Sequence, residues 1–292
     1  MGKITILPET TTDPISLMGR RAGVCWGGDV TDAKKNYKRG LDCLESNHGR
    51  VLEFVNVEMV IEGYSARVMR EWYTHIGGAP TRLQASTRYI NYGDFDYVVP
   101  QTIRPGSDEW VAYIDTIAHI KVGLMKLNTL GVPREDLATL LPFCMTTTVV
   151  DKRNLRNLID MSRQRMCTRA YWEFRQLFKD VCDALSGISE EWAYIVRTQM
   201  KPKCKYLGYC PEKKSCGKYK HGITQTTQDK DADIHVATKE EIDLANQFMR
   251  QPYVPDEPMK FYGVIPTITN TPPIDPSIHV WSDGTQKDEV SD

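Results

Sequence analysis

The sequence predicts a globular chain of the α/β class, and three stretches carry that prediction. Residues 107–130 and 151–185 repeat apolar side chains every three or four positions, which is the spacing of an amphipathic helix. Residues 51–61 (VLEFVNVEMVI) combine β-branched residues with partial alternation, which is typical of a strand. A chain of 292 residues with 41% hydrophobic side chains can bury a sizeable core.

The elements before residue 62 are predicted from short local signals. Residues 3–7 form a strand, and a helix begins at Asp13-Pro14, because proline is favoured in the first helical turn, and ends near Val24. A second helix is expected from about Thr31 to Ser46. A polar turn at residues 47–50 then leads into the predicted strand at 51–61.

The next segment combines a helix start, a glycine turn and a row of polar side chains. Ser65 is a suitable N-cap for a short helix, which the Gly77-Gly78 pair ends. Gln84, Ser86 and Arg88 then follow at every second position, and an extended segment would point all three to one side. Amide, hydroxyl and guanidinium donors on one face suit a phosphate or a nucleotide. The alternative is a solvated polar loop.

The second half of the chain is predicted to be mainly helical. After the helix at 107–130, a short helix starts at Pro133 and ends at Leu141-Pro142. Residues 151–185 are predicted as one long helix with many arginines. An arginine that is buried without a partner is costly, so at least one is expected to meet an anionic or polar ligand; the alternative is pairing along a wet helix face. These arginines are Arg153, Arg156, Arg163, Arg165, Arg169 and Arg175.

Charge and hydropathy argue against several classes of protein. The 37 basic and 38 acidic residues nearly cancel, which gives no support to a general nucleic-acid-binding protein. No apolar run approaches the roughly 20 residues that a membrane helix needs. The N-terminal segment has no basic region followed by a long apolar core, so we expect a cytoplasmic protein without a secretory signal.

A cysteine-rich segment and a proline-rich tail follow the helices. Cys204, Cys210 and Cys216 recur with five residues between neighbours, and His221 lies close behind. Three thiolates and an imidazole can hold a tetrahedral zinc ion, although zinc motifs usually have shorter spacings. The alternative is a lysine-flanked loop with spare thiols. We predict a domain at residues 1–221 and a proline-rich C-terminal extension at residues 222–292.

Two stretches together resemble the flavin-dependent thymidylate synthase family. That family shows an Arg-His-Arg element, followed by Gln/Glu-x-Ser-x-Arg-Tyr. Here Thr74-His75-Ile76 stands at the first element, and residues 84–89 (QASTRY) match the second. Residues 154–175 resemble the family's long helix, with its Ala-x-Trp-Glu phrase. The resemblance spans roughly residues 3 to 200.

The resemblance implies a fold, a reaction and partners. The fold is of the α+β type, with a central antiparallel-rich sheet and long helices, in a homotetramer whose active sites lie between subunits. Members of the family bind FAD, reduce it with NADPH, and transfer a carbon from methylenetetrahydrofolate to C5 of dUMP. The flavin carries the redox chemistry, so no cysteine nucleophile is needed. The implied partners are a pyrimidine nucleotide and further copies of the chain, without nucleic acid or membrane.

The family's functional residues carry over to matching positions of this sequence. Arg165 falls where the family places an arginine against the pyrimidine, where it orients the base and stabilises charge on it, so it is the catalytic candidate. The nucleotide-binding candidates are Gln84, Ser86, Arg88, Arg70 and Glu71, with Arg88 on the phosphate. The flavin-binding candidates are His75, Thr74, Ile76, Arg50, Glu53, Asn154, Asp160 and Arg82.

Four positions depart from the family's pattern. Thr74 and Ile76 replace both arginines of the Arg-His-Arg element, and Arg82 is expected to restore one of those charges. Ala138 stands where the family often has a phosphate-binding arginine, and Asp160 where it often has an asparagine near FAD. Two alternatives therefore stay open. One is a related enzyme that methylates or hydroxymethylates dCMP or another pyrimidine nucleotide, and the other is a non-catalytic protein that binds nucleotide or metal.

Overall fold

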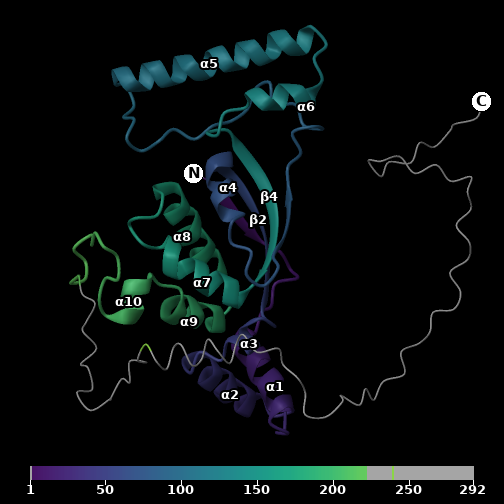
Figure 1. The fold of residues 1–292 in the computed structure, drawn as a ribbon. Coiled ribbons are helices and arrows are strands. Elements are labelled where there is room, and N and C mark those ends of the chain that lie inside the picture. Colours follow the sequence, from purple (N-terminus) through teal and green to yellow (C-terminus); the bar gives the residue numbers. More distant parts are fainter. Residues whose placement is uncertain (1, 222–238, 240–292) are drawn as a thin grey trace, which may run out of the picture. The chain divides into compact units, whose positions relative to one another are not determined.

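The computed structural model describes residues 2–221 and Lys239, and it is a mixed structure of helices around an antiparallel sheet (Figure 1). The four strands run in the order β1-β2-β4-β3, and every neighbouring pair is antiparallel. The strands are β1 (Lys3–Ile6), β2 (Asn56–Ser65), β3 (Thr81–Gln84) and β4 (Thr146–Asn154). The prediction of an α+β fold with an antiparallel sheet is confirmed. The predicted extension at residues 222–292 lies outside the described residues, except for Lys239.

Several helices begin where the sequence provides a capping side chain. Ser65, Ser107 and Asn154 each accept a hydrogen bond from a backbone N–H of the helix that follows. The N-terminal helices are α1 (Pro14–Cys25), α2 (Ala33–Glu45), α3 (Gly49–Leu52) and α4 (Ala66–Trp72). The later ones are α5 (Asp108–Thr129), α6 (Arg134–Leu137), η1 (Ala138–Leu140), α7 (Leu155–Arg165), α8 (Trp172–Ser186), α9 (Glu190–Gln199) and α10 (Lys203–Leu207). No helix in the described part of the chain has the length and apolar character needed to cross a membrane.

Three predicted elements differ from the structure. The strand predicted at 51–61 starts only at Asn56, because residues 49–52 form the helical turn α3, which buries Leu52. The long helix predicted at 151–185 begins at Leu155 and breaks between α7 and α8, since residues 151–154 pair with β2 as the end of β4. The extended segment predicted through Arg88 ends at Gln84, and residues 86–90 form a turn.

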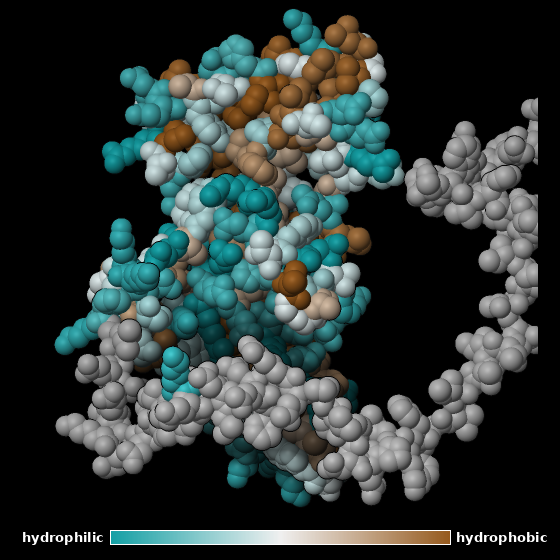
Figure 2. Space-filling view, in the orientation of Figure 1, coloured by the Kyte–Doolittle hydropathy of each residue, from teal (hydrophilic) through white to brown (hydrophobic). Residues whose placement is uncertain are grey.

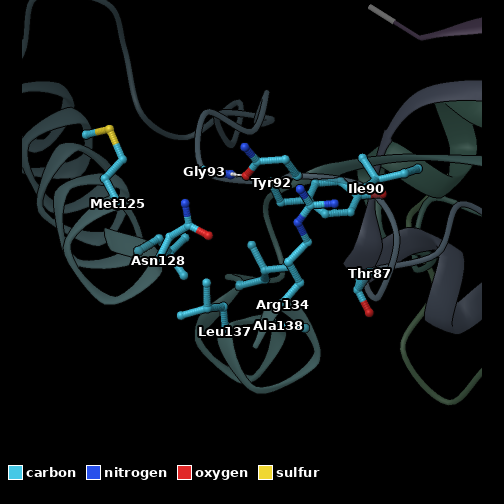
Figure 3. Close-up of a pocket in the computed structure, with 12 residues that line it drawn as sticks. Thr87, Ile90, Tyr92, Gly93, Met125, Asn128, Arg134, Leu137 and Ala138 are labelled. Atoms are coloured by element: carbon cyan, nitrogen blue, oxygen red, sulfur yellow. Dashed lines mark hydrogen bonds between the residues drawn. The ribbon is translucent and has the colours of Figure 1, made fainter. Parts of the chain in front are cut away.

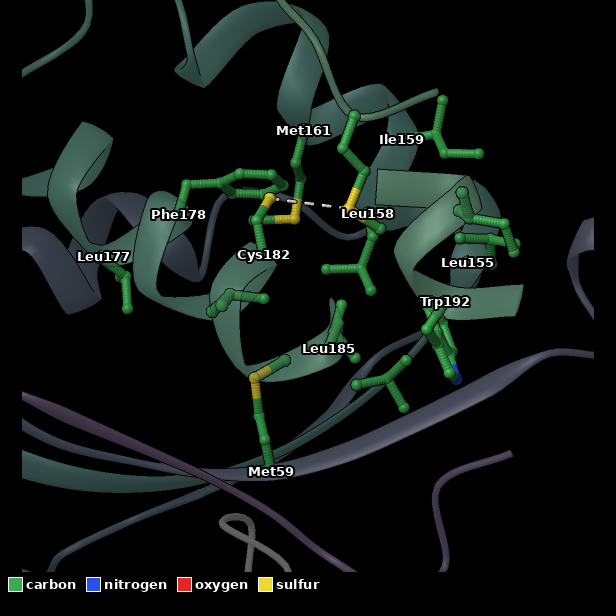
Figure 4. Packing of buried hydrophobic residues seen from close by; sticks show 14 of the residues in the cluster. Met59, Leu155, Leu158, Ile159, Met161, Leu177, Phe178, Cys182, Leu185 and Trp192 are labelled. Atoms are coloured by element: carbon green, nitrogen blue, oxygen red, sulfur yellow. Dashed lines mark hydrogen bonds between the residues drawn. The ribbon is translucent and has the colours of Figure 1, made fainter. Parts of the chain in front are cut away.

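The main hydrophobic core lies between helices and one face of the sheet. Alternate residues of β2 (Val57, Met59 and Ile61) are fully buried there. They belong to one cluster with α7, α8 and α9, which includes the α8 residues Phe174 and Phe178 (Figure 4). Burial of a large apolar side chain stabilises the fold by about 1.5–3 kcal/mol, so this cluster fixes α7 and α8 against the sheet.

A second, smaller cluster holds α5. Its buried members are Phe95, Ile117, Leu124, Leu137 and Met145. The apolar stripe predicted for this helix is confirmed, because its members are the buried or half-buried residues of α5. Other apolar side chains of the helix are exposed, and hydrophobic residues are visible over the α5 region in the space-filling view (Figure 2).

A fully buried ion pair lies at the end of β4. Asp151 and Arg153 are two residues apart on one face of the strand, and both side chains are 0% exposed. The guanidinium makes two bonds to the carboxylate, at 2.5 and 2.7 Å, and lies 4.3 Å from the centre of the Trp72 ring. The indole N–H of Trp72 donates to the same carboxylate, and Arg153 also donates to Asn157. One of the predicted arginines is thus inside the core, paired with the protein itself.

Candidate active site

Three candidate side chains meet between α4 and α7, and one of them, Arg165, is at least 90 positions away from the other two in sequence. Arg165 Nε donates to His75 Nε2 at 2.9 Å, and Arg165 Nη1 donates to Glu71 Oε2 at 3.1 Å. The guanidinium of Arg165 also lies 4.8 Å from the centre of the Phe174 ring. The structure therefore joins the pyrimidine-side candidate to one flavin candidate and one nucleotide candidate.

The imidazole of His75 is held neutral by its surroundings. Burial, followed by the positive charges of Arg165 and Arg153, lowers the pKa of His75 to about 4. Because Nε2 accepts from Arg165, the ring hydrogen is assigned to Nδ1. A neutral imidazole lets the charge of Arg165 stand beside it without repulsion.

We expect the His75 contact to make the fold sensitive to acid. A histidine pKa below its unfolded value of about 6.5 means that the unfolded chain binds the proton more readily. The stability from neutral His75 is thus complete above about pH 6.5 and is lost as the pH falls toward 4. The free energy of unfolding is measured with urea at pH 7 and at pH 5. Between these pH values wild type should lose on the order of 1 kcal/mol more of this free energy than His75→Gln does; the expected difference is small because the site is partly exposed.

His119→Gln is the control for this prediction, because His119 is an exposed residue of α5 outside the site. It should leave the pH dependence of the unfolding free energy unchanged. Equal acid sensitivity of His75→Gln and wild type would contradict the predicted role of His75.

A glycine turn brings the His75 segment against the start of α7. Gly78 has φ +74°, and a Cβ at this position would lie 2.2 Å from Nδ2 of Asn154, so glycine permits the close approach. The Asn154 side chain is itself held, since its Oδ1 accepts from the backbone N–H of Asn157 at 2.9 Å. Thr74 donates its hydroxyl to the Glu71 carbonyl, and Ile76 is exposed. His75 and Asn154, two flavin candidates, are therefore on adjoining segments.

A polar pocket of about 170 Å³ lies between α3 and α7. It is lined by Asn47, Gly49, Leu52, Arg156, Ile159, Asp160 and Arg163. Arg156 Nη1 donates to Glu53 Oε1 at 2.5 Å, which makes an ion pair. Of the flavin candidates, Asp160 lines this pocket and Glu53 pairs with the lining residue Arg156. Glu53 and Arg50 are exposed, and neither lines the pocket.

Two arginines at this pocket were not among the site candidates. Arg156 and Arg163 fall on the face of α7 that also carries Asp160, at positions i, i+4 and i+7. Their spacing can be read from the sequence. A single long helix with six arginines, however, gives no reason to choose these two as site residues over the other four. In the structure Arg156 pairs with Glu53 and Arg163 pairs with Asp160.

The nucleotide motif lies at the end of β3 and in the turn after it. Gln84 donates to the Thr147 hydroxyl at 3.3 Å, and the Ser86 hydroxyl accepts from the backbone N–H of Arg88. Arg88 pairs with Glu135 at 3.0 Å. Within the part of the chain that the structure describes, no hydrogen bond or ion pair joins these side chains to Arg165 or His75.

The remaining candidates have separate positions. Arg70 is exposed on α4. Arg82 donates to the Tyr73 carbonyl at 2.8 Å, and its guanidinium lies 4.7 Å from the centre of the Tyr73 ring. Ala138 lines a pocket of about 60 Å³ between α5, α6 and residues 87–93, together with Arg134, which lies one helical turn earlier (Figure 3).

The predicted zinc site is not formed. Cys204, Cys210 and Cys216 line one pocket of about 430 Å³ together with Cys167. In residues 2–221, however, no three side chains of histidine, cysteine, aspartate or glutamate are grouped closely enough to hold a metal ion. The ring of His221 lies beside the backbone of this loop, with Nδ1 3.4 Å from the Cys210 carbonyl oxygen. The alternative of a loop with free thiols fits the structure.

A family model described as "Thymidylate synthase complementing protein" matches residues 7–189, which is more than half of the chain. The chain belongs to this family. A flavin-dependent thymidylate synthase from Nitratidesulfovibrio vulgaris is 31% identical over 190 residues, which cover 60% of this chain and 74% of the relative. The corresponding protein of Pyrococcus horikoshii is 29% identical over 177 residues, with coverages of 58% and 71%.

A solved structure has a fold similar to that of this chain. It is the flavin-dependent thymidylate synthase ThyX from Helicobacter pylori, complexed with FAD and dUMP, with a TM-score of 0.54. The match covers 68% of this chain and 100% of that chain, and at 17% identity it shows the fold alone. The residues matched by the family model include every nucleotide and flavin candidate from Arg50 to Arg165 but not the cysteines at 204–216.

Proposed function

We propose that the chain catalyses the flavin-dependent methylation of dUMP to dTMP, with methylenetetrahydrofolate as the carbon donor and NADPH as the reductant. The observation that carries the proposal is the contact of Arg165 with His75 and Glu71, in a chain that belongs to the family. A homotetramer with shared active sites, which the family resemblance implies, is part of the proposal. The cytoplasmic location remains a prediction.

Arg165 is suited to hold and polarise the pyrimidine. Its side chain is fixed by a neutral imidazole on one side and a carboxylate on the other. A guanidinium held in this way is preorganised, so it stabilises negative charge that develops on the base without moving. Glu71 and His75 are thus positioning residues for Arg165.

Residues along α7 and on the segments beside it fit the phosphates of FAD. Arg156 in the first turn of α7 and Arg163 in its last turn line a polar pocket. Asn154 caps the start of the helix, Glu53 pairs with Arg156, and the glycine turn after His75 approaches Asn154 closely. Guanidinium groups bind phosphate through charge-assisted hydrogen bonds. When bound, FAD supplies the hydride that completes the methyl group. In this proposal three arginines take the place of the two that the family has at positions 74 and 76. They are Arg156, Arg163 and Arg82, the last of which follows His75 closely in the sequence.

Arg156→Ala is expected to weaken FAD binding by roughly 10-fold or more, because a charge-assisted hydrogen bond contributes about 1.5–3 kcal/mol. The measurement is the dissociation constant of FAD for the apoprotein, followed by flavin fluorescence. Arg20→Ala is a matched control, since Arg20 is also a half-exposed arginine paired with a carboxylate, at 2.8 Å from Asp13. Equal FAD affinity of both variants would remove Arg156 from the proposed site.

The absorbance spectrum of the purified full-length protein tests the proposed function. A flavin spectrum that bleaches under anaerobic NADPH, and faster in the presence of dUMP, would support it. A colourless protein that shows no bleaching after FAD is added would contradict it and favour the non-catalytic binding protein.

A further inference from the structure

Two neighbouring residues of α6 hold two neighbouring residues of the nucleotide motif. Glu135 Oε2 lies 3.0 Å from Arg88 Nε, and Arg134 Nη1 donates to the Tyr89 carbonyl oxygen at 2.8 Å. The contacts join segments more than 40 residues apart in sequence. The start of α6 therefore fixes both the backbone and the charged side chain of this turn.

The two contacts differ in how an anion would affect them. The side chains of Arg88 and Glu135 are 66% and 56% exposed, so their ion pair is in water and is weak. A phosphate dianion is a competing partner for the same guanidinium, with a larger charge than a carboxylate. The bond from Arg134 ends on a neutral carbonyl and can keep the turn against α6 while Arg88 changes partner.

We propose that Glu135 holds Arg88 in the nucleotide-free protein and that the phosphate of the nucleotide displaces it. The inference rests on the proposed function, in which Arg88 binds that phosphate. Glu135 is then a positioning residue with two opposite effects on nucleotide binding. It keeps Arg88 in place before the nucleotide binds, but its negative charge repels the incoming phosphate. The affinity of the nucleotide is set by this competition.

The surroundings of the pair support an anion site at this end of α6. Arg134 lines the pocket in Figure 3 together with Thr87 and Ala138. Ala138 brings no charge to the pocket. Arg88 and Arg134 are therefore the guanidinium groups that meet the 87–90 turn, and Glu135 is the carboxylate that offsets them.

The test is calorimetric titration of dUMP into the full-length protein at low salt. Glu135→Gln keeps the size of the side chain and removes its charge. We expect this variant to bind dUMP about two- to fivefold more tightly than wild type, the range of an exposed ion pair, and to lose that gain at high salt. Deoxyuridine, which has no phosphate, should bind both proteins equally. Asp183→Asn, which breaks an exposed pair on α8, should leave dUMP affinity unchanged.

The double variant Arg88→Ala/Glu135→Gln separates the mechanism from a general charge effect. In the Arg88→Ala background, Glu135→Gln should give no gain in dUMP affinity. A persistent gain, or a Glu135→Gln variant that binds dUMP no better than wild type, would overturn the inference. If Arg88→Ala alone binds dUMP as tightly as wild type, the assignment of Arg88 in the proposed function fails, and this is a different result from the failure of Glu135→Gln.

Discussion

Replacing Arg165 with alanine is expected to lower kcat for dTMP formation by about a hundred- to a thousandfold. The reason is that Arg165 is a preorganised charge, and loss of one such group at a developing charge has an effect of this size. Its preorganisation comes from the bonds to His75 and Glu71. Steady-state kinetics with dUMP, methylenetetrahydrofolate and NADPH measures the effect.

Two further variants show whether the effect belongs to the site. Arg165→Lys keeps the charge but lacks the planar fork that reaches both partners, so it should recover only part of the activity. Arg197→Ala removes an exposed arginine of α9 that lies over Tyr194 and should retain wild-type kcat. An Arg165→Ala enzyme within threefold of wild type would rule out a catalytic role for this residue.

Asp151→Asn is expected to lower the free energy of unfolding by about 3–5 kcal/mol. The substitution leaves the fully buried Arg153 without its counter-charge, which is the costly way to break a buried ion pair. It also weakens the bond that the Trp72 indole donates to this carboxylate. The measurement is the midpoint of denaturant unfolding at neutral pH.

The exposed pair of Lys179 and Asp183 provides the comparison. Its atoms are 2.6 Å apart, but both side chains are more than 60% exposed, so Lys179→Ala should change the unfolding free energy by less than about 1 kcal/mol. If Asp151→Asn and Lys179→Ala lowered the free energy of unfolding equally, burial of the Asp151–Arg153 pair would not explain its contribution to stability.

Local signals predicted the parts of the fold that local chemistry decides. Ser65 was predicted as an N-cap, and the helix that starts after Ser107 follows its apolar stripe closely. The errors arise where tertiary pairing overrides local pattern. Arg153 and Asp151 were assigned to a helix, yet they belong to β4 because β2 supplies the backbone partners.

The sequence named candidate site residues one by one, but it gave no arrangement for them. The resemblance pointed to His75 and Arg165 separately, whereas their direct bond joins residues 90 positions apart and depends on the packing of α4 and α7 against α8. The pair of Arg88 and Glu135 is equally non-local. The zinc prediction failed because regular spacing of cysteines does not specify where their thiols point.

The most direct test of the proposed function is the mass of the nucleotide product after turnover of dUMP with FAD, NADPH and methylenetetrahydrofolate, with dCMP assayed in parallel. The proposal predicts a product heavier than dUMP by one CH2 group and coincident with dTMP, with no conversion of dCMP. Unchanged dUMP beside methylated or hydroxymethylated dCMP, or a product of dUMP that carries an additional oxygen, would contradict it.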